Sequence, residues 1–226
     1  MMGFLGEIGR RVGRRIEKAR RRRQSRFQAP YRELERLGII SHFRGYPRKA
    51  IKPEWDDLHG IYLLVMERRP AVIVELGGGY STFVIAHAVR ELVQQGHTTV
   101  FWTVDESPFW QDVVRDRMPK GLLPFIKFWH SEPKMIDLDG ESVAMFERLP
   151  VEACNFVYVD GGLPEGHKRS AGADAYLLEA NAPPDYAVLV DGRAATCSFL
   201  ERKLRYQYDI GTNAYGVQTL FTRRPQ

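Results

Sequence analysis

The feature that most constrains the fold is an alternation of short apolar runs with segments of helical character. Five runs follow one another after residue 70: AVIVEL (71–76), TTVFWTVD (98–105), FIKFWH (125–130), NFVYVD (155–160) and YAVLVD (186–191). Apolar runs separated by helices indicate a mostly parallel sheet with helices on both faces. The chain has 226 residues, of which 44% are hydrophobic, so it is long enough to bury such a core.

The segments between the runs carry helix signals. The first helix is expected to open at Ser81 or Thr82 and the second at Ser107, while a third is placed on ESVAMFERL (141–149). Two more are expected near residues 170–180 and 195–204. The chain closes with RYQYDI (205–210) and VQTLFTR (217–223), which flank the turn-rich GTNAYG. These two runs predict an antiparallel strand pair.

The N-terminal segment is strongly basic. Residues 1–30 carry ten Lys or Arg against two Glu, whereas 23 basic and 26 acidic residues follow. Within residues 1–27, apolar side chains at helical spacing predict a basic amphipathic helix, which can lie on an anionic membrane surface. A solvated tail and, more weakly, a nucleic-acid contact are the alternatives. We therefore divide the chain into an arm (1–30), a helical segment (31–70) and the α/β domain (71–226).

Cysteine use and hydropathy bear on the compartment. Cys154 and Cys197 are the only cysteines and lack the spacing of a zinc site or a disulfide framework. No stretch approaches the ~20 apolar residues of a membrane span, and no secretory signal is recognised. These patterns favour the cytoplasm, with the basic arm as a means of peripheral attachment to the membrane.

Three consecutive glycines follow the first apolar run, in VIVELGGGYSTFVIAHAV (72–89). A strand ending in Glu75, then Gly77 and Gly79, then a helix, puts a glycine turn at the carboxyl edge of the predicted sheet, where such sheets bind ligands. Glycines let a ligand approach the backbone, and helix amides favour an anionic group. Asp105 ends the next strand and is placed to accept hydrogen bonds from ribose hydroxyls. The pattern predicts a nucleoside site, with a tight turn that binds nothing as the alternative.

Two residues separate one nucleoside ligand from another. A dinucleotide-binding turn reads G-x-G-x-x-G, and Thr82 stands at the third glycine position. Glu75 places a carboxylate before the glycines, which suits a cationic amino group and opposes a pyrophosphate. The turn therefore favours a nucleoside that bears an amino acid.

These residues resemble class I S-adenosylmethionine-dependent methyltransferases. VELGGGYSTFVIA (74–86) and WTVDESPFWQDVV (102–114) resemble the first two motifs of the branch with an E-x-G-x-G-Y-S-T first motif. FVYVDGG (156–162) and AVLVDGR (187–193) resemble its fourth and fifth strand ends, so the resemblance spans residues 71–222. It implies a Rossmann-like α/β fold, in which a seven-stranded, mostly parallel sheet has an antiparallel last strand.

The resemblance also implies S-adenosylmethionine as cofactor. The two outer glycines would pass under its methionine part, the glutamate would lie near its amino group, and the aspartate would hold the ribose. His130 or Ser131, after the third strand, would contact adenine. The cofactor-binding residues so implied are Glu75, Gly77, Gly79, Ser81, Asp105, His130 and Ser131.

Two further strand ends deliver acids to the same edge. Asp160 and Asp191 end their runs, and His167 and Arg169 follow Asp160 on a predicted loop. Methyl transfer to oxygen requires that the acceptor proton be removed, so His167 is the first candidate for the base and Asp160 the second. The alternatives are aspartates that cap turns and an exposed loop histidine.

Metal-dependent relatives, such as the macrocin O-methyltransferase type, carry additional acids beside the two aspartates to bind magnesium. Gly162 and Gly192 stand there instead, so no metal site is expected, and magnesium held by the aspartates alone is the alternative. Arg169 and Arg193 near this edge favour an anionic acceptor, such as a carboxylate, a phosphate or an acidic sugar.

The leading hypothesis is a methyltransferase that methylates an oxygen of a small molecule or glycan. A nicotinamide-dependent oxidoreductase and a non-catalytic cofactor-binding domain, tethered to a membrane by the arm, are the alternatives. No pattern names the acceptor or the oligomeric state.

Overall fold

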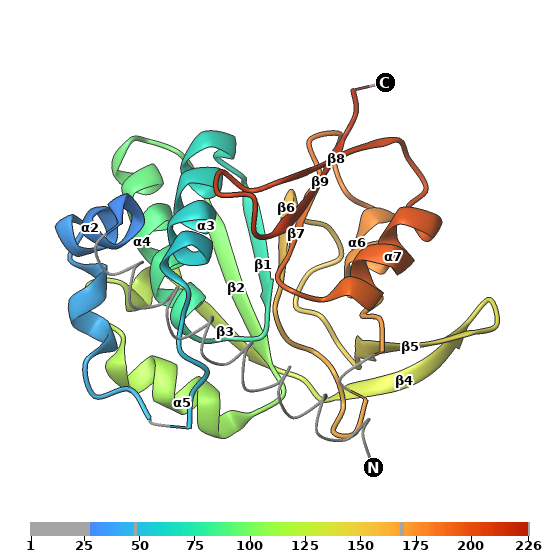
Figure 1. The fold of residues 1–226 in the computed structure, drawn as a ribbon, viewed down its shortest axis with the longest axis horizontal. Coiled ribbons are helices and arrows are strands. Elements are labelled where there is room, and N and C mark those ends of the chain that lie inside the picture. Colours follow the sequence, from blue (N-terminus) through green and yellow to red (C-terminus); the bar gives the residue numbers. More distant parts are fainter. Residues whose placement is uncertain (1–27, 48, 168–169, 226) are drawn as a thin grey trace, which may run out of the picture.

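The computed structural model describes residues 28–47, 49–167 and 170–225. Figure 1 shows a central sheet with helices on either side of it. Seven strands form this sheet in the order β3-β2-β1-β6-β7-β9-β8. Their bounds are β1 Val72–Leu76, β2 Val100–Asp105, β3 Lys127–His130, β6 Phe156–Val159, β7 Ala187–Val190, β8 Tyr208–Thr212 and β9 Thr219–Arg223.

The strand directions confirm the predicted fold class. Strands β3, β2, β1, β6 and β7 pair in parallel, and they are the five apolar runs of the sequence. Strand β9 pairs antiparallel with both β7 and β8, as expected for the C-terminal strand pair. The chain leaves β1 toward β2 on one side and leaves β6 toward β7 on the other, so the strand order reverses between β1 and β6. Such a switch point opens a crevice at the carboxyl ends of the strands.

The helices occupy most of the predicted segments. Their bounds are α2 Ala29–Arg36, the 3-10 helix η1 Ile39–Phe43, α3 Trp55–Arg68, α4 Tyr80–Gln94, α5 Pro108–Arg117, the 3-10 helix η2 Leu123–Phe125, α6 Asp174–Glu179 and α7 Ala194–Lys203. Ser107 caps α5 as expected, since its hydroxyl accepts a hydrogen bond from the amide of Trp110 at 3.3 Å. Helix α4 begins slightly earlier than expected, at Tyr80. None of the helices described is long and apolar enough to cross a membrane. The predicted arm helix (1–27) lies outside the described residues.

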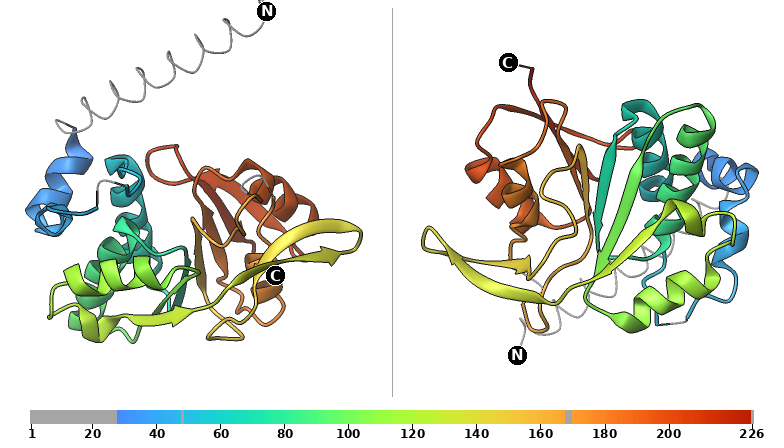
Figure 2. Two further views of the ribbon diagram at one scale, coloured as in Figure 1. Left: turned by 90° about the horizontal axis from the view of Figure 1, so that it is seen from below. Right: turned by 180° about the vertical axis from the view of Figure 1, so that it is seen from behind.

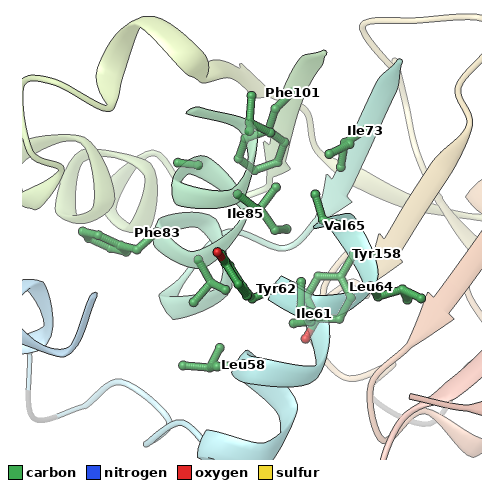
Figure 3. Close-up of a cluster of buried hydrophobic side chains, with 14 of the residues drawn as sticks. Leu58, Ile61, Tyr62, Leu64, Val65, Ile73, Phe83, Ile85, Phe101 and Tyr158 are labelled. Atoms are coloured by element: carbon green, nitrogen blue, oxygen red, sulfur yellow. The ribbon is translucent and has the colours of Figure 1, made fainter. Parts of the chain in front are cut away.

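Each face of the sheet has its own core, because successive side chains of a strand point to opposite faces. Ile73 packs with residues of α2 to α5 on one face, a cluster shown in Figure 3. Its neighbour Val74 packs with residues of α6 and α7 on the other face. Both side chains are fully buried. The strands therefore read as continuous apolar runs, as is typical of a parallel sheet covered on both sides.

The helix expected over residues 141–149 is wrong. A β-hairpin made of β4 (Pro133–Leu138) and β5 (Glu141–Phe146) takes its place and projects from the body, as Figure 2 shows. Asp139 and Gly140 form its tip with φ angles of 52° and 81°. Positive φ at both central residues is the requirement of a tight hairpin turn, for which Asp-Gly is a preferred pair. The Asp-Gly pair was therefore the local signal for this hairpin.

The base and the tip of the hairpin are both held by other elements. The amide of Ala144 donates to the carbonyl of Ala171 at 2.8 Å, and Ala173 donates back to Ala144 at 2.8 Å. At the tip, the guanidinium of Arg202 in α7 lies 2.6 Å from the carboxylate of Glu141. These contacts attach the hairpin to the segment that leads from β6 into α6 and to α7.

Candidate functional site

The glycine turn follows β1 directly and is packed differently on its two sides. Gly77 has a φ of +96°, and a Cβ atom there would lie 2.5 Å from the Cα of Gly161, which follows β6. A Cβ atom on Gly161 would collide with Gly77 in return. At Gly79, by contrast, a Cβ atom would meet no atom within 4 Å. Gly77 is thus required by the contact between two loops, whereas Gly79 borders open space.

Glu75 supports the turn from beneath. It is fully buried, and its two carboxylate oxygens accept hydrogen bonds from the hydroxyls of Ser81 at 2.5 Å and Thr82 at 2.6 Å. Thr82 in turn accepts a hydrogen bond from the amide of Gly79 at 3.0 Å. Burial raises the pKa of Glu75 to about 7, although the hydroxyl donors oppose this rise. Glu75 and Ser81 therefore shape the turn, and Glu75 can act on a ligand only through its charge.

Asp105 joins the glycine turn to the start of α5. One carboxylate oxygen accepts a hydrogen bond from the amide of Gly78 and the other from the amide of Ser107, both at 2.7 Å. Burial and the neighbouring charge of Glu106 raise the pKa of Asp105 to about 6. Because a carboxylate oxygen can accept more than one hydrogen bond, Asp105 retains capacity for ligand hydroxyls.

His130 and Ser131 follow at the end of β3. His130 is opposite Asp105 in the register of β2 and β3, and its exposed ring lies 3.2 Å from the carbonyl oxygen of Glu106. Ser131 is buried, and its hydroxyl accepts a hydrogen bond from the amide of Arg148 at 3.0 Å. His130 is therefore open to a ligand beside Asp105, while the Ser131 hydroxyl already holds the loop after β5.

A cavity of about 500 Å³ opens beyond the turn, at the carboxyl ends of β6 and β7. It is lined by Asp160, Leu163, Ser170, Asp191, Gly192, Arg193, Ala194 and Ala195. The two strand-end acids that the sequence singled out thus meet in one recess. The guanidinium of Arg193 lies 3.9 Å from the Asp160 carboxylate and also donates a hydrogen bond to the Asp160 carbonyl.

The charge state of Asp160 is set by this recess. Burial and the charge of Asp191 raise the pKa of the Asp160 carboxyl, while Arg193 lowers it. Since 46% of the side chain is accessible to solvent, water moderates the effect of burial. The direction is nevertheless upward, which brings Asp160 closer to the pH at which it can both take up and release a proton.

Tyr158 was missed by the sequence reasoning. Its hydroxyl is 3.4 Å from a carboxylate oxygen of Asp191, to which it can donate a hydrogen bond, and the amide of Gln218 points at the same hydroxyl from 3.4 Å. Both Tyr158 and Gln218 are buried. Tyr158 stands within an apolar strand, so its position in the sequence does not distinguish it from a core residue, and nothing local indicates its contact with Asp191. Gly161 was also missed, although the Gly-Gly pair after Asp160 marked a close approach of backbones.

His167 does not line the cavity. It is exposed on a turn, where its amide donates a hydrogen bond to the carbonyl of Pro164 at 3.0 Å. Arg169 lies outside the described residues. The structure therefore brings together Asp160, Asp191 and Arg193 but leaves His167 on the surface of the loop.

The cavity acids Asp160 and Asp191 are the candidate metal ligands of this region. In the part of the chain that the structure describes, no group of three or more His, Cys, Asp or Glu side chains is arranged to hold a metal ion. Asp160 and Asp191 are the acids that line the cavity.

The comparisons with known proteins rest on structure. No protein-family model matches the sequence, and no curated protein matches it. The chain is similar to the S-adenosylhomocysteine-bound methyltransferase PaMTH1 from Podospora anserina, with a TM-score of 0.53, 13% identity, and coverage of 82% of this chain and 87% of that one. It is also similar to TomG, an O-methyltransferase from Streptomyces achromogenes involved in tomaymycin synthesis and solved in complex with S-adenosylmethionine. For TomG the TM-score is 0.50, the identity 14%, and the coverage 84% and 89%.

At these identities the similarity defines the fold. The chain has the Rossmann-like fold of the class I methyltransferases, with its antiparallel strand next to the sheet edge.

Proposed function

We propose that this protein is an S-adenosylmethionine-dependent methyltransferase that transfers the methyl group to an oxygen of a small molecule. The observation that carries the proposal is the hydrogen bond between Gly78 and Asp105, which joins the glycine turn and the β2 acid into one ligand-binding edge. This edge lies at the switch point of the sheet and next to the cavity at Asp160. Both fold neighbours described above were solved with the cofactor or its demethylated product.

The residues present fit this cofactor. Gly79 leaves room for a ligand over the turn, and Asp105 keeps the capacity to accept hydrogen bonds from ribose hydroxyls. His130, which is exposed opposite Asp105, would be open to the adenine of a bound cofactor. When its carboxyl group is ionised, the buried Glu75 favours the cationic amino and sulfonium groups of the cofactor through electrostatic attraction. When bound, the cofactor supplies an electrophilic methyl group.

The same arrangement argues against a nicotinamide dinucleotide. Thr82 stands where a dinucleotide site needs its third glycine, and it is fully buried between the amide of Gly79 and the carboxylate of Glu75. A pyrophosphate over this turn would bring its negative charges next to the buried Glu75 with no cationic group beside them, whereas the carboxylate of S-adenosylmethionine is accompanied by a cationic amino group. The oxidoreductase hypothesis is therefore the weaker of the two.

The cavity beyond the turn is the proposed acceptor site. Asp160 borders it and also adjoins Gly161, whose backbone contacts the glycine turn. An acceptor hydroxyl in the cavity would therefore lie within reach of both Asp160 and the cofactor. We assign Asp160 as the base that accepts the hydroxyl proton, because its raised pKa suits proton uptake near neutral pH. Arg193 adjusts the charge of Asp160 and is only in part available to an anionic acceptor.

Calorimetry with S-adenosylhomocysteine and with NAD tests the cofactor. Binding of S-adenosylhomocysteine with no binding of NAD is expected, and the reverse result would overturn the proposal. Transfer of a radiolabelled methyl group to a panel of hydroxylated small molecules and sugars then tests the reaction. Binding without transfer to any acceptor would favour the non-catalytic alternative.

Variants in the cavity test the base. Asp160→Asn is expected to lower kcat by about a hundredfold. His167→Ala is expected to leave kcat within about twofold, because the side chain is exposed and outside the cavity. A large loss in His167→Ala alone would restore His167 as the base. Loss of activity in EDTA that magnesium restores would instead make Asp160 and Asp191 metal ligands.

A further inference from the structure

Tyr46 lies in the loop after η1, far from the glycine turn in sequence but next to it in space. Its ring centroid is 4.1 Å from that of Tyr80, the first residue of α4, and 6.2 Å from that of Phe83. On its other side it lies nearly parallel to Trp110 in the first turn of α5, at 6.5 Å. Tyr46 therefore bridges the N-terminal ends of α4 and α5, the two helices that follow the glycine turn and Asp105.

The packing accounts for the Tyr46 ring but not for its hydroxyl. The hydroxyl oxygen is buried and has no hydrogen-bond partner among the described residues. A buried hydroxyl without a partner loses its hydrogen bonds to water and gains none in return, so such groups in native proteins call for an explanation. Tyr62, which is also buried, shows the usual outcome, since its hydroxyl donates to Glu91 at 2.7 Å.

The surroundings of the Tyr46 hydroxyl decide what it can bind. Burial is the main cause that raises the pKa of Tyr46, the nearby acidic groups of Tyr80, Glu75 and Asp105 add to the rise, and Arg117 lowers it. The phenol therefore keeps its proton and offers it as a donor. The partner must then be a hydrogen-bond acceptor on a ligand that lies over the edge formed by the turn and Asp105.

We propose that the Tyr46 hydroxyl donates a hydrogen bond to the α-carboxylate of the bound cofactor. This inference rests on the proposed function and adds a binding residue from outside the sheet domain. Tyr46 stacks on Tyr80, and the free amides in the first turn of a helix attract an anionic group. The amide of Gly79 is already bonded to Thr82, so a carboxylate there has further need of a side-chain donor.

Two ligands and two variants test the assignment. S-adenosylhomocysteine carries the carboxylate, and decarboxylated S-adenosylhomocysteine differs only in lacking it. Tyr46→Phe removes the hydroxyl and keeps the ring, and Tyr62→Phe is the matched control. We expect Tyr46→Phe to weaken binding of S-adenosylhomocysteine about tenfold or more and to leave binding of the decarboxylated ligand unchanged. Tyr62→Phe should change neither affinity.

A second measurement separates binding from folding. Because the Tyr46 hydroxyl has no hydrogen-bond partner among the residues that the structure describes, Tyr46→Phe should unfold at the same temperature as the wild type or higher, whereas Tyr62→Phe should unfold at a lower one. Equal weakening of both ligands would move the contact to the nucleoside part and overturn the assignment, as would unchanged binding of S-adenosylhomocysteine. If the wild type binds neither ligand, the proposed function fails and the assignment falls with it.

Discussion

Asp105→Ala removes the side chain that joins the glycine turn to α5. Asp105 accepts hydrogen bonds from the amides of Gly78 and Ser107, each at 2.7 Å, and hydrogen bonds to a charged group contribute about 1.5–3 kcal/mol each. Part of this free energy is recovered, because water can enter the truncated site and a buried charge is removed. We therefore expect the free energy of unfolding to fall by about 2–4 kcal/mol.

The same substitution is expected to weaken cofactor binding. The ribose loses an acceptor and the glycine turn loses its tie to α5, which together should cost about 1.5–3 kcal/mol, or ten- to a hundredfold in the affinity for S-adenosylhomocysteine. Calorimetry measures this at a temperature at which circular dichroism shows the variant folded. Asp112→Ala is the control, since Asp112 is an exposed acid of α5 paired with Arg115 at 2.8 Å. It should change either quantity by less than about 0.5 kcal/mol.

Asp105→Asn provides an internal check. Its carbonyl oxygen can still accept one of the two amides, but its NH₂ group then faces the other N–H. Asp105→Asn should therefore lose less stability and less affinity for S-adenosylhomocysteine than Asp105→Ala does. A folded Asp105→Ala protein that binds S-adenosylhomocysteine as tightly as the wild type would refute the reasoning, because neither the ribose contact nor the shape of the turn would then depend on Asp105.

Three further predictions concern the turn, the core and the arm. Gly79→Ala should weaken cofactor binding with little effect on stability, because the added Cβ atom enters the open space proposed for the cofactor. Gly161→Ala should destabilise the fold, because the added Cβ atom meets the backbone of Gly77. Calorimetry and thermal unfolding of both variants measure these effects. Burial raises the pKa of Asp174 to about 7, so the folded state binds a proton that the unfolded state has lost. Stability should therefore fall by up to roughly 4 kcal/mol as pH rises from about 4 through 7, and Asp174→Asn should flatten this dependence in urea titrations at several pH values. Deletion of residues 1–28 should leave cofactor affinity unchanged and abolish flotation with anionic liposomes; equal flotation of both forms would exclude the membrane hypothesis.

The regular part of the fold could be predicted because its signals are local. Each parallel strand is an apolar run, and the capping residue Ser107 precedes its helix in the sequence. The hairpin β4–β5 was mistaken for a helix because Val143 and Phe146, three positions apart, have helical spacing, although the Asp-Gly pair before them indicated a turn between two strands. In so short an apolar segment the spacing alone does not decide between helix and strand.

The candidate site was predicted in its main-chain positions more than in its side-chain roles. Strand ends placed Asp105, Asp160 and Asp191 at one edge, since that follows from topology. The sequence could not reveal that Glu75 is sealed beneath the turn, nor that His167 sits away from the cavity, because burial depends on segments distant in the chain. Tyr46 belongs to the same class, since only the packing of the loop after η1 brings it to the turn.

The contact between Gly77 and Gly161 has a mechanical consequence. It joins the loop that would carry the methyl donor to the loop that follows Asp160, and it does so through backbone atoms with no side chain between them. Side chains rotate among several rotamers, whereas two backbones in contact have no such freedom. In the proposed reaction, the backbone contact therefore fixes the distance between the methyl donor and the acceptor site. A different acceptor would have to be accommodated by changes in the side chains that line the cavity, and not by a change in this contact.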